Sequence, residues 1–217
     1  EKAHDEIFNF IGEMVKAGIV PLSCGGDHSV SLPILRAVAK QPLAFIHIDA
    51  HTDTWDSFQG SKFNHGAPFR RAHEEGLIDA TKTVQIGIRG AQNVSEGWDY
   101  SKNAGMRVVF VEELQKRGVD EIVEETRSIV GDAPVYLSFD IDSLDPAFAP
   151  GTGTPEIAGL TTPEAMALIR GFRNLSYVGA DMVEVSPPFD TGGLTSMTGA
   201  TVMYELLCVL AEAVSAG

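Results

Sequence analysis

The chain has 217 residues, 44% of them hydrophobic, which suffices to bury one large core and fits a single domain. Its 16 Lys and Arg against 30 Asp and Glu give a net charge of −14, which excludes the basic surface that nucleic-acid binding requires. Two cysteines without metal-ligand spacing, Cys24 and Cys208, exclude a disulfide framework and a thiolate zinc site. They favour a reducing, cytoplasmic compartment.

The first residues, EKAHDEIFNF, lack the pattern of a signal peptide, and no apolar run reaches the roughly 18–20 residues of a membrane span. We therefore expect no membrane partner. The chain starts without Met and directly in a helix-like stretch, so we expect it to lack an N-terminal portion.

Apolar runs of strand length alternate with longer stretches of helical period. In chain order we expect helix 2–16, strand 19–24, helix 28–39, strand 43–48, helix 65–75, strands 82–88 and 107–111, helix 119–130, strand 134–139, helix 162–173, strand 176–183 and helix 195–213. Runs such as PLAFIHI and PVYLSF are continuously apolar, as strands buried on both faces are. The sequence therefore predicts one α/β domain over 1–217, with a mostly parallel sheet in a three-layer α/β/α arrangement.

One stretch, 143–160, follows a strand and is dense in Gly and Pro. We interpret it as a long ordered loop that carries function.

Clustered His and Asp residues follow three of the predicted strands, in segments 25–28 (GGDH), 49–53 (DAHTD) and 140–142 (DID). In parallel sheets, ligands bind beyond the carboxyl ends of strands, where these segments converge. Side chains alternate along an extended segment, so Asp49, His51 and Asp53 share one side, and so do Asp140 and Asp142. The candidate ligands are His28, Asp49, His51, Asp53, Asp140 and Asp142.

Four carboxylates packed together require cations, because mutual repulsion would otherwise force them to bind protons. Oxygen-rich ligands with some imidazole favour two Mn²⁺ ions, although nickel, cobalt or zinc could also occupy such a site. Any one Asp alone would more simply cap a helix or turn after its strand. The joint pattern favours the metal centre.

These residues resemble the signatures of the ureohydrolase family, which includes arginase, agmatinase, guanidinobutyrase and proclavaminate amidinohydrolase. The similar segments are CGGDHS at 24–29, DAHTD at 49–53 and SFDIDSLDP at 138–146, in family order. The resemblance covers the whole chain, but family members usually carry a further strand and helices upstream.

The resemblance implies a role for each matched position. Glu184, in DMVEVSPPFD, matches the glutamate that binds the guanidinium group. His65, in KFNHGAPF, matches the histidine that assists proton transfer or positions substrate. Ala158 departs from the family pattern, which has glycine there. The implied ligands are His28 and Asp53 for one metal, His51 and Asp142 for the other, and Asp49 and Asp140 as bridges.

The implied reaction is hydrolysis of a guanidino compound to urea and an amine. Metal-activated water is expected to attack the guanidinium carbon, with Asp53 carrying a proton to the leaving amine. Family resemblance also implies a homo-oligomer, a trimer or hexamer.

We expect the small cationic substrate agmatine, whose hydrolysis gives putrescine and belongs to polyamine metabolism. In arginases the metal motif continues into Asp-Ile-Asn, whose Asn helps hold the substrate carboxylate, whereas here Thr54, Trp55 and Asp56 follow. The loop DPAFAPGTGTPE also looks like the agmatinase and guanidinobutyrase form. The alternative is guanidinobutyrate or another ω-guanidino acid. Asp56 could pair with an ammonium tail, or a carboxylate tail could pair with Lys62, Arg70 or Arg71.

Two other functions are weighed. An inactive regulatory homologue is disfavoured because all six ligands, Glu184 and His65 are present. Deacetylation or phosphoester hydrolysis is disfavoured because an acidic Glu184 suits a cationic guanidinium and repels phosphate.

Several conspicuous residues are expected to have no direct role. His47 is interpreted as a packed histidine behind the ligands, and His4 and His73 as solvated on helices. Cys24 is expected to be a small buried hydrophobe. Gly25 and the glycine after it are expected to let the backbone turn tightly.

Overall fold

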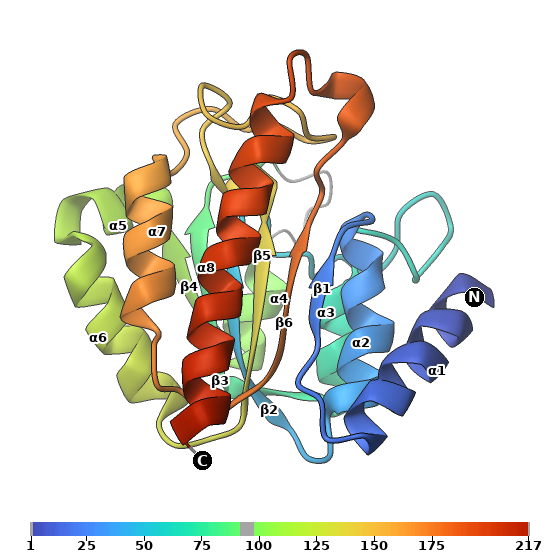
Figure 1. The fold of residues 1–217 in the computed structure, drawn as a ribbon. Coiled ribbons are helices and arrows are strands. Elements are labelled where there is room, and N and C mark those ends of the chain that lie inside the picture. The colour runs from blue at the N-terminus through green and yellow to red at the C-terminus, as the bar shows by residue number, and fades with distance from the viewer. Residues whose placement is uncertain (1, 92–97, 217) are drawn as a thin grey trace.

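The computed structural model describes residues 2–91 and 98–216, which form one parallel sheet between two layers of helices (Figure 1). The six strands are all parallel and lie in the order β1-β6-β5-β2-β3-β4. The strands are β1 (Leu22–Cys24), β2 (Leu43–Ile48), β3 (Ile78–Ile88), β4 (Arg107–Phe110), β5 (Val135–Asp140) and β6 (Tyr177–Val183). The predicted α/β class and parallel sheet are confirmed.

The helices cover both faces of the sheet. The α-helices are α1 (Lys2–Lys16), α2 (Ser31–Val38), α3 (Pro68–Glu74), α4 (Asp99–Ala104), α5 (Val111–Arg117), α6 (Val119–Val130), α7 (Thr162–Gly171) and α8 (Leu194–Ala216). Short 3-10 turns are η1 (His28–Val30), η2 (Ile141–Ser143) and η3 (Pro187–Phe189). One apolar core joins α5 to α8 with one face of the sheet, and a second joins α1 to α3 with the other face. In Figure 1, α6, α7 and α8 lie together, away from α1 and α2.

Strand β2 lies in the interior of the sheet, and all six of its residues are buried. Its alternating side chains supply both cores: Ile46 and Ile48 pack with the α5–α8 side, and Phe45 with the α1–α3 side. This burial on both faces explains its continuous apolar run. The same alternation fixes which side chains emerge at its carboxyl end.

Several element boundaries differ from the prediction, including that of the longest strand, β3, which begins at Ile78 rather than at residue 82. The predicted strand 107–111 ends at Phe110, because Val111 already begins α5. Helices α4 and α5, of 6 and 7 residues, were not predicted. The predicted helix 28–39 is divided into η1 and α2, since Asp27 accepts a hydrogen bond from the Ser29 amide and caps a separate 3-10 turn.

Helix α8 contradicts the expectation that no apolar run reaches the length of a membrane span. Its segment Leu194–Ser215 is long and apolar enough to cross a membrane, by length and composition alone, and 28% of it is buried. One side of the helix, including Val202, Leu206 and Val209, packs in the core against the sheet. Helices that cover a sheet meet the same criterion of length and composition.

Candidate metal centre and substrate cavity

Four strand ends bring the predicted site residues together. His28 follows β1, the DAHTD segment follows β2, Asp142 follows β5 and Glu184 follows β6. Because β6 lies between β1 and β5, and β2 pairs with β5, these four ends are neighbours at one edge of the sheet. All six predicted ligands and Glu184 meet there.

The His28 ring forms the first group of candidate ligands. Its Nδ1 atom lies 3.1 Å from Asp49 Oδ2, 2.9 Å from Asp53 Oδ2 and 3.1 Å from Asp140 Oδ2. All four side chains are buried. One imidazole nitrogen therefore faces three carboxylates from two strand ends.

His51 forms the second group. Its Nδ1 atom lies 3.2 Å from Asp142 Oδ2 and 3.5 Å from Asp49 Oδ1. Asp49 therefore contributes one carboxylate oxygen to each group. Asp49 thus lies between the two groups, whereas Asp140 Oδ2 faces the first group through His28. The pairing that the family resemblance implies stays a prediction.

The hydrogen bonds of His28 show that a cation fits this donor set. Ser138 Oγ donates to Asp181 Oδ1 at 2.6 Å, so its remaining interaction with His28 Nε2, at 2.8 Å, must accept the imidazole proton. In the neutral ring Nδ1 then carries a lone pair, and it has no hydrogen-bond partner although it is buried. A lone pair aimed at three carboxylates is repulsive unless a metal ion or a proton lies between them.

The shifted pKa values have the same origin. Burial alone would lower the pKa of His28, but the adjacent carboxylates of Asp140, Asp49 and Asp53 raise it well above its ordinary value, because they stabilise a proton on Nδ1. Burial and the charges of Asp142 and Asp49 raise the pKa of Asp140. His51 likewise has a raised pKa, because its bonds to Asp142 and Asp49 outweigh burial. Without metal, the cluster holds protons where cations would otherwise balance its charge.

His47 lies next to the candidate ligands, but its ring donates a hydrogen bond to Asp49. Gln85 Nε2 donates to the carbonyl of Thr52 at 2.7 Å, which fixes its amide, and also lies 3.0 Å from His47 Nδ1. His47 Nδ1 is therefore an acceptor, and Nε2 donates to Asp49 Oδ2 at 2.7 Å. The ring packs against Phe69, with centroids 4.4 Å apart. Although its position would allow metal ligation, its hydrogen bonds fit the predicted packed histidine behind the ligands.

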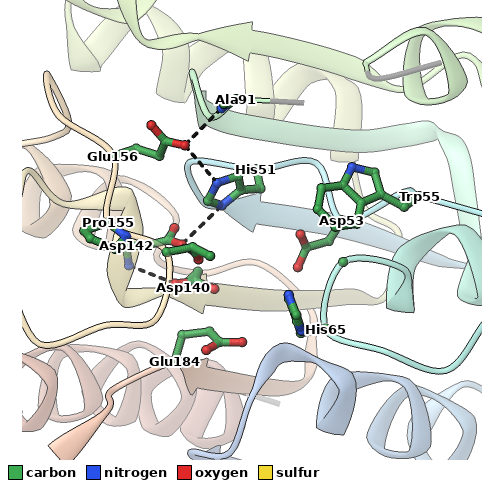
Figure 2. A pocket seen from close by; sticks show the side chains of 12 residues that line it. His51, Asp53, Trp55, His65, Ala91, Asp140, Asp142, Pro155, Glu156 and Glu184 are labelled. Atoms are coloured by element: carbon green, nitrogen blue, oxygen red, sulfur yellow. Dashed lines mark hydrogen bonds and ion pairs between the residues drawn. The ribbon is translucent and has the colours of Figure 1, made fainter. Parts of the chain in front are cut away.

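A cavity of about 240 Å³ opens beside the ligands (Figure 2). It is lined by His51, Asp53, Trp55, His65, Gly66, Ala91, Asp140, Asp142, Thr154, Pro155, Glu156 and Glu184. Both residues predicted to act on substrate, Glu184 and His65, thus face the same space as the ligands. Besides His51 and His65, the titratable side chains of this lining in the described part of the chain are the carboxylates of Asp53, Asp140, Asp142, Glu156 and Glu184.

Glu184 is tied directly to the ligand region. Its Oε1 atom accepts a hydrogen bond from the His28 amide at 2.7 Å. Burial, reinforced by the charges of Asp53 and Asp142, raises its pKa to about 7. A bound guanidinium cation would stabilise the ionised carboxylate.

The backbone at two of these residues is in the left-handed region, with φ of 50° at Asp53 and 67° at Glu184. Such conformations are uncommon for residues other than glycine and often occur at functional sites. Gly26 is also in the left-handed region, with φ of 78°, and a Cβ atom there would overlap the side chain of Val30. The expected tight turn at the glycine pair is therefore present.

Some sequence interpretations need correction. Cys24 is exposed rather than buried, because β1 lies at an edge of the described sheet. His4 is partly buried, with Nε2 3.4 Å from Ser29 Oγ. His73 Nδ1 lies 2.9 Å from the Tyr100 hydroxyl, so its ring has a partner.

The charged residues considered for binding the substrate tail do not line the cavity. Asp56 instead pairs with Arg71 at 2.9 Å, with Arg70 at 3.6 Å and with Lys62 at 3.7 Å. They form a network among themselves.

Glu156 lines the cavity and was not singled out in the sequence. Its Oε1 atom lies 3.5 Å from His51 Nε2 and accepts a hydrogen bond from the Ala91 amide at 3.0 Å. Its placement within loop 143–160 was the only sequence signal, because a loop without periodicity does not indicate where a side chain points.

The fold and the site together define an α/β protein with paired carboxylate and histidine clusters at the carboxyl edge of a parallel sheet. A sequence model of the arginase family matches residues 1–209. The chain belongs to the arginase family.

The proteins that the chain is similar to are named after different substrates. It is 54% identical over 208 residues to a guanidinopropionase from Pseudomonas aeruginosa, covering 95% of this chain and 65% of that protein. It is 51% identical to a mitochondrial agmatinase from Gallus gallus, covering 91% of this chain and 59% of that protein. The solved structure of a proclavaminate amidino hydrolase from Streptomyces clavuligerus superposes with a TM-score of 0.93 at 45% identity, over 97% of this chain and 71% of that one. The chain thus spans about 60–65% of these two curated relatives.

Proposed function

We propose that the protein hydrolyses a guanidino compound to urea and an amine, using two divalent metal ions. The observation that carries this proposal is the buried His28 Nδ1 lone pair aimed at three carboxylates, beside a cavity that Glu184 lines. When bound, the two ions would supply Lewis-acid polarisation and an activated water at neutral pH.

Side chains of the protein would bind the substrate and transfer the proton. Glu184 would hold the guanidinium group by charge-assisted hydrogen bonds, within a buried setting that strengthens them. Water adds to the guanidinium carbon, the bond from that carbon to the substituted nitrogen breaks, and urea and a protonated amine are released. Asp53, which lines the cavity, would carry a proton to the departing nitrogen, since an amine leaves poorly unless protonated.

His65 lies at the cavity with its ring near two aromatic side chains, 5.8 Å from Phe58 and 6.5 Å from Trp55 between centroids. We propose that it positions the substrate or assists the proton transfer. Manganese is the metal we propose, because carboxylate-rich sites with some imidazole suit it.

Agmatine is the substrate we propose, because the acidic side chains that line the cavity outside the proposed ligand set, Glu156 and Glu184, favour a cationic tail. A carboxylate-bearing tail would be repelled there. A guanidino acid is the second candidate, supported by the similarity to a guanidinopropionase.

Steady-state urea release by the manganese-loaded protein distinguishes these candidates. We expect kcat/KM to be highest for agmatine among agmatine, 3-guanidinopropionate, 4-guanidinobutyrate and L-arginine. A higher value for either guanidino acid would move the assignment to the second candidate. No urea from any of the four would contradict the proposed reaction.

Assembly as a homo-oligomer, a trimer or hexamer, remains a proposal that rests on family resemblance. The outer side of α8 offers apolar surface for such contacts, with Met197 and Tyr204 each 64% exposed. Light scattering at micromolar concentration would measure the mass, and a monomer would contradict the proposal.

A further inference from the structure

We propose that Glu156 is a positioning residue for His51 and thereby sets the affinity of the metal ion that His51 and Asp142 would hold. The inference rests on the proposed two-metal function and adds a residue outside the predicted ligand set.

The orientation of the His51 ring is the first observation. Nδ1 faces Asp142 Oδ2 at 3.2 Å, and Nε2, on the opposite side of the ring, faces Glu156 Oε1 at 3.5 Å. Figure 2 shows His51 between these two carboxylates. A carboxylate next to Nε2 favours the tautomer that carries its proton there, which leaves the Nδ1 lone pair for a metal.

The other candidate histidine ligand shows the same arrangement inside the core. His28 turns Nδ1 toward the ligand carboxylates and Nε2 toward Ser138 Oγ at 2.8 Å. Ser138 in turn donates to Asp181 Oδ1 at 2.6 Å. Each histidine therefore has an acidic residue behind its Nε2 atom, through a hydroxyl for His28 and directly for His51.

Glu156 is itself held in place from the strand end after β3. The Ala91 amide donates to its Oε1 atom at 3.0 Å. Arg89 Nη2 donates to the Glu156 carbonyl at 2.6 Å and to the Asp142 carbonyl at 2.8 Å. One guanidinium group thus joins the backbone of Glu156 to the backbone of a candidate ligand.

Gly90 leaves the space that this arrangement needs. A Cβ atom at Gly90 would overlap Nε2 and Cδ2 of His51, so the ring lies directly against the glycine. The His51 ring is therefore confined by backbone on one side and by Glu156 at its Nε2 edge.

The two histidines differ in exposure. The side chains of His51 and Glu156 are 15% and 28% exposed, whereas that of His28 is 1% exposed. Among residues 2–91 and 98–216, Glu156 pairs with His51 and not with His28 or Asp53. Its loss should therefore weaken one of the two metal positions and leave the other.

Manganese titration monitored by calorimetry tests this inference on Glu156→Leu, which removes the acceptor, and Glu156→Gln, which keeps an acceptor oxygen. We expect Glu156→Leu to weaken one of two dissociation constants by about 10–100-fold, the usual effect of losing a partner behind a ligand. Glu156→Gln should weaken it less. The control Glu124→Leu makes the same substitution at an exposed position on α6 and should change neither constant.

The same titration of two double variants identifies which metal ion is affected. In His51→Ala, adding Glu156→Leu should change nothing more, whereas in His28→Ala it should still weaken the remaining ion. Circular dichroism of the metal-free variants checks that each is folded.

Unchanged constants in Glu156→Leu would overturn the inference, and so would equal weakening of both ions or a wild-type protein that binds one ion. A protein that binds two ions with this pattern but releases no urea would instead contradict the proposed reaction alone.

Discussion

Two features of Glu184 favour the proposed role in binding the substrate over a role as a metal ligand. Its carboxylate lines the cavity and accepts a hydrogen bond from the His28 amide, but it lies on a different strand end from the ligand carboxylates. In Glu184→Gln the amide oxygen can still accept that hydrogen bond, while the charge that attracts guanidinium is lost. We expect kcat/KM to fall by about 10²–10³-fold, the usual effect of losing one preorganised group at a reacting centre.

Metal analysis of the same variant supplies one control, because its manganese content should remain at the wild-type value. The matched variant Glu205→Gln changes a glutamate of α8 that pairs with Arg170 of α7, and it should leave the activity unchanged. Loss of metal together with activity would place Glu184 among the ligands instead.

Ala158 is a residue at which the backbone is strained. Its φ is 61°, and its side chain is exposed. Ala158→Gly removes a left-handed alanine, which costs about 1–2 kcal/mol, but increases the freedom of the unfolded chain by about 0.4–1 kcal/mol. We expect a net stabilisation of about 0.5–1 kcal/mol, measured by urea unfolding. A destabilised variant would show that the methyl group has a packing role.

Among single residues, the sequence predicted which candidate ligands would lie together, because each lies at or just after the carboxyl end of a strand. It did not indicate Glu156 or Gln85. Glu156 lies in a loop without periodicity, and Gln85 lies inside β3, where a polar residue in an apolar run does not reveal its partner.

Loop 143–160 has no helix or strand of its own beyond the end of η2, and Arg89 is one of the side chains that hold it. Arg89 donates hydrogen bonds to the carbonyls of Gly87, Asp142, Ser143, Leu144, Glu156 and Ile157. Burial lowers its pKa, so these carbonyls replace the water that a cation loses there. The loop is held to the end of β5 through this guanidinium group.

Arg89→Lys keeps the charge but cannot reproduce a planar group with five N–H donors. We expect a loss of about 2–4 kcal/mol in the free energy of unfolding, because several charged hydrogen bonds are lost together. Arg127→Lys is the matched control, since Arg127 donates only to the Gly171 and Arg173 carbonyls in the described structure. Similar losses in both variants would show that the loop has no special dependence on Arg89.

Whether a helix could be predicted from the sequence depended on its length. The buried strands and the long helices have clear apolar patterns, whereas α4 and α5 have too few residues for a helical period to be recognised. The sequence DYSKNA of α4 has no apolar stripe, and its helix depends on packing next to β4.

For the whole molecule, the carboxylate cluster makes the stability of the metal-free protein depend on pH in an unusual direction. The raised pKa values of His28 and His51 give stability that is fully present below about pH 6.5 and is lost as pH rises through their folded values. Glu184, raised from 4.5 to about 7, also binds its proton more tightly in the folded state, so its contribution is lost over that interval. The lowered pKa of Asp49 acts in the opposite direction, but its contribution is already present above its ordinary value of 3.8.

We therefore expect the Tm of the metal-free protein to fall between pH 5 and pH 8. Manganese should reverse this trend, because its ligands must lose protons to bind it and its stabilisation grows with pH. Calorimetry with EDTA and with excess manganese at four pH values measures both trends. A metal-free Tm that rises across this range would contradict the expectation.

The strand order has a consequence for a chain that is still being made on the ribosome. The segments after β2 and β5 emerge before β6, and these two strands hydrogen-bond to each other directly. β1, which precedes His28, is joined to the sheet only through β6 within the described structure, and the His28 amide is bonded by Glu184 at the end of that strand. The half of the candidate centre that contains His51 and Asp142 can therefore form in a nascent chain, whereas the half that contains His28 is completed only after residue 184 has been synthesised.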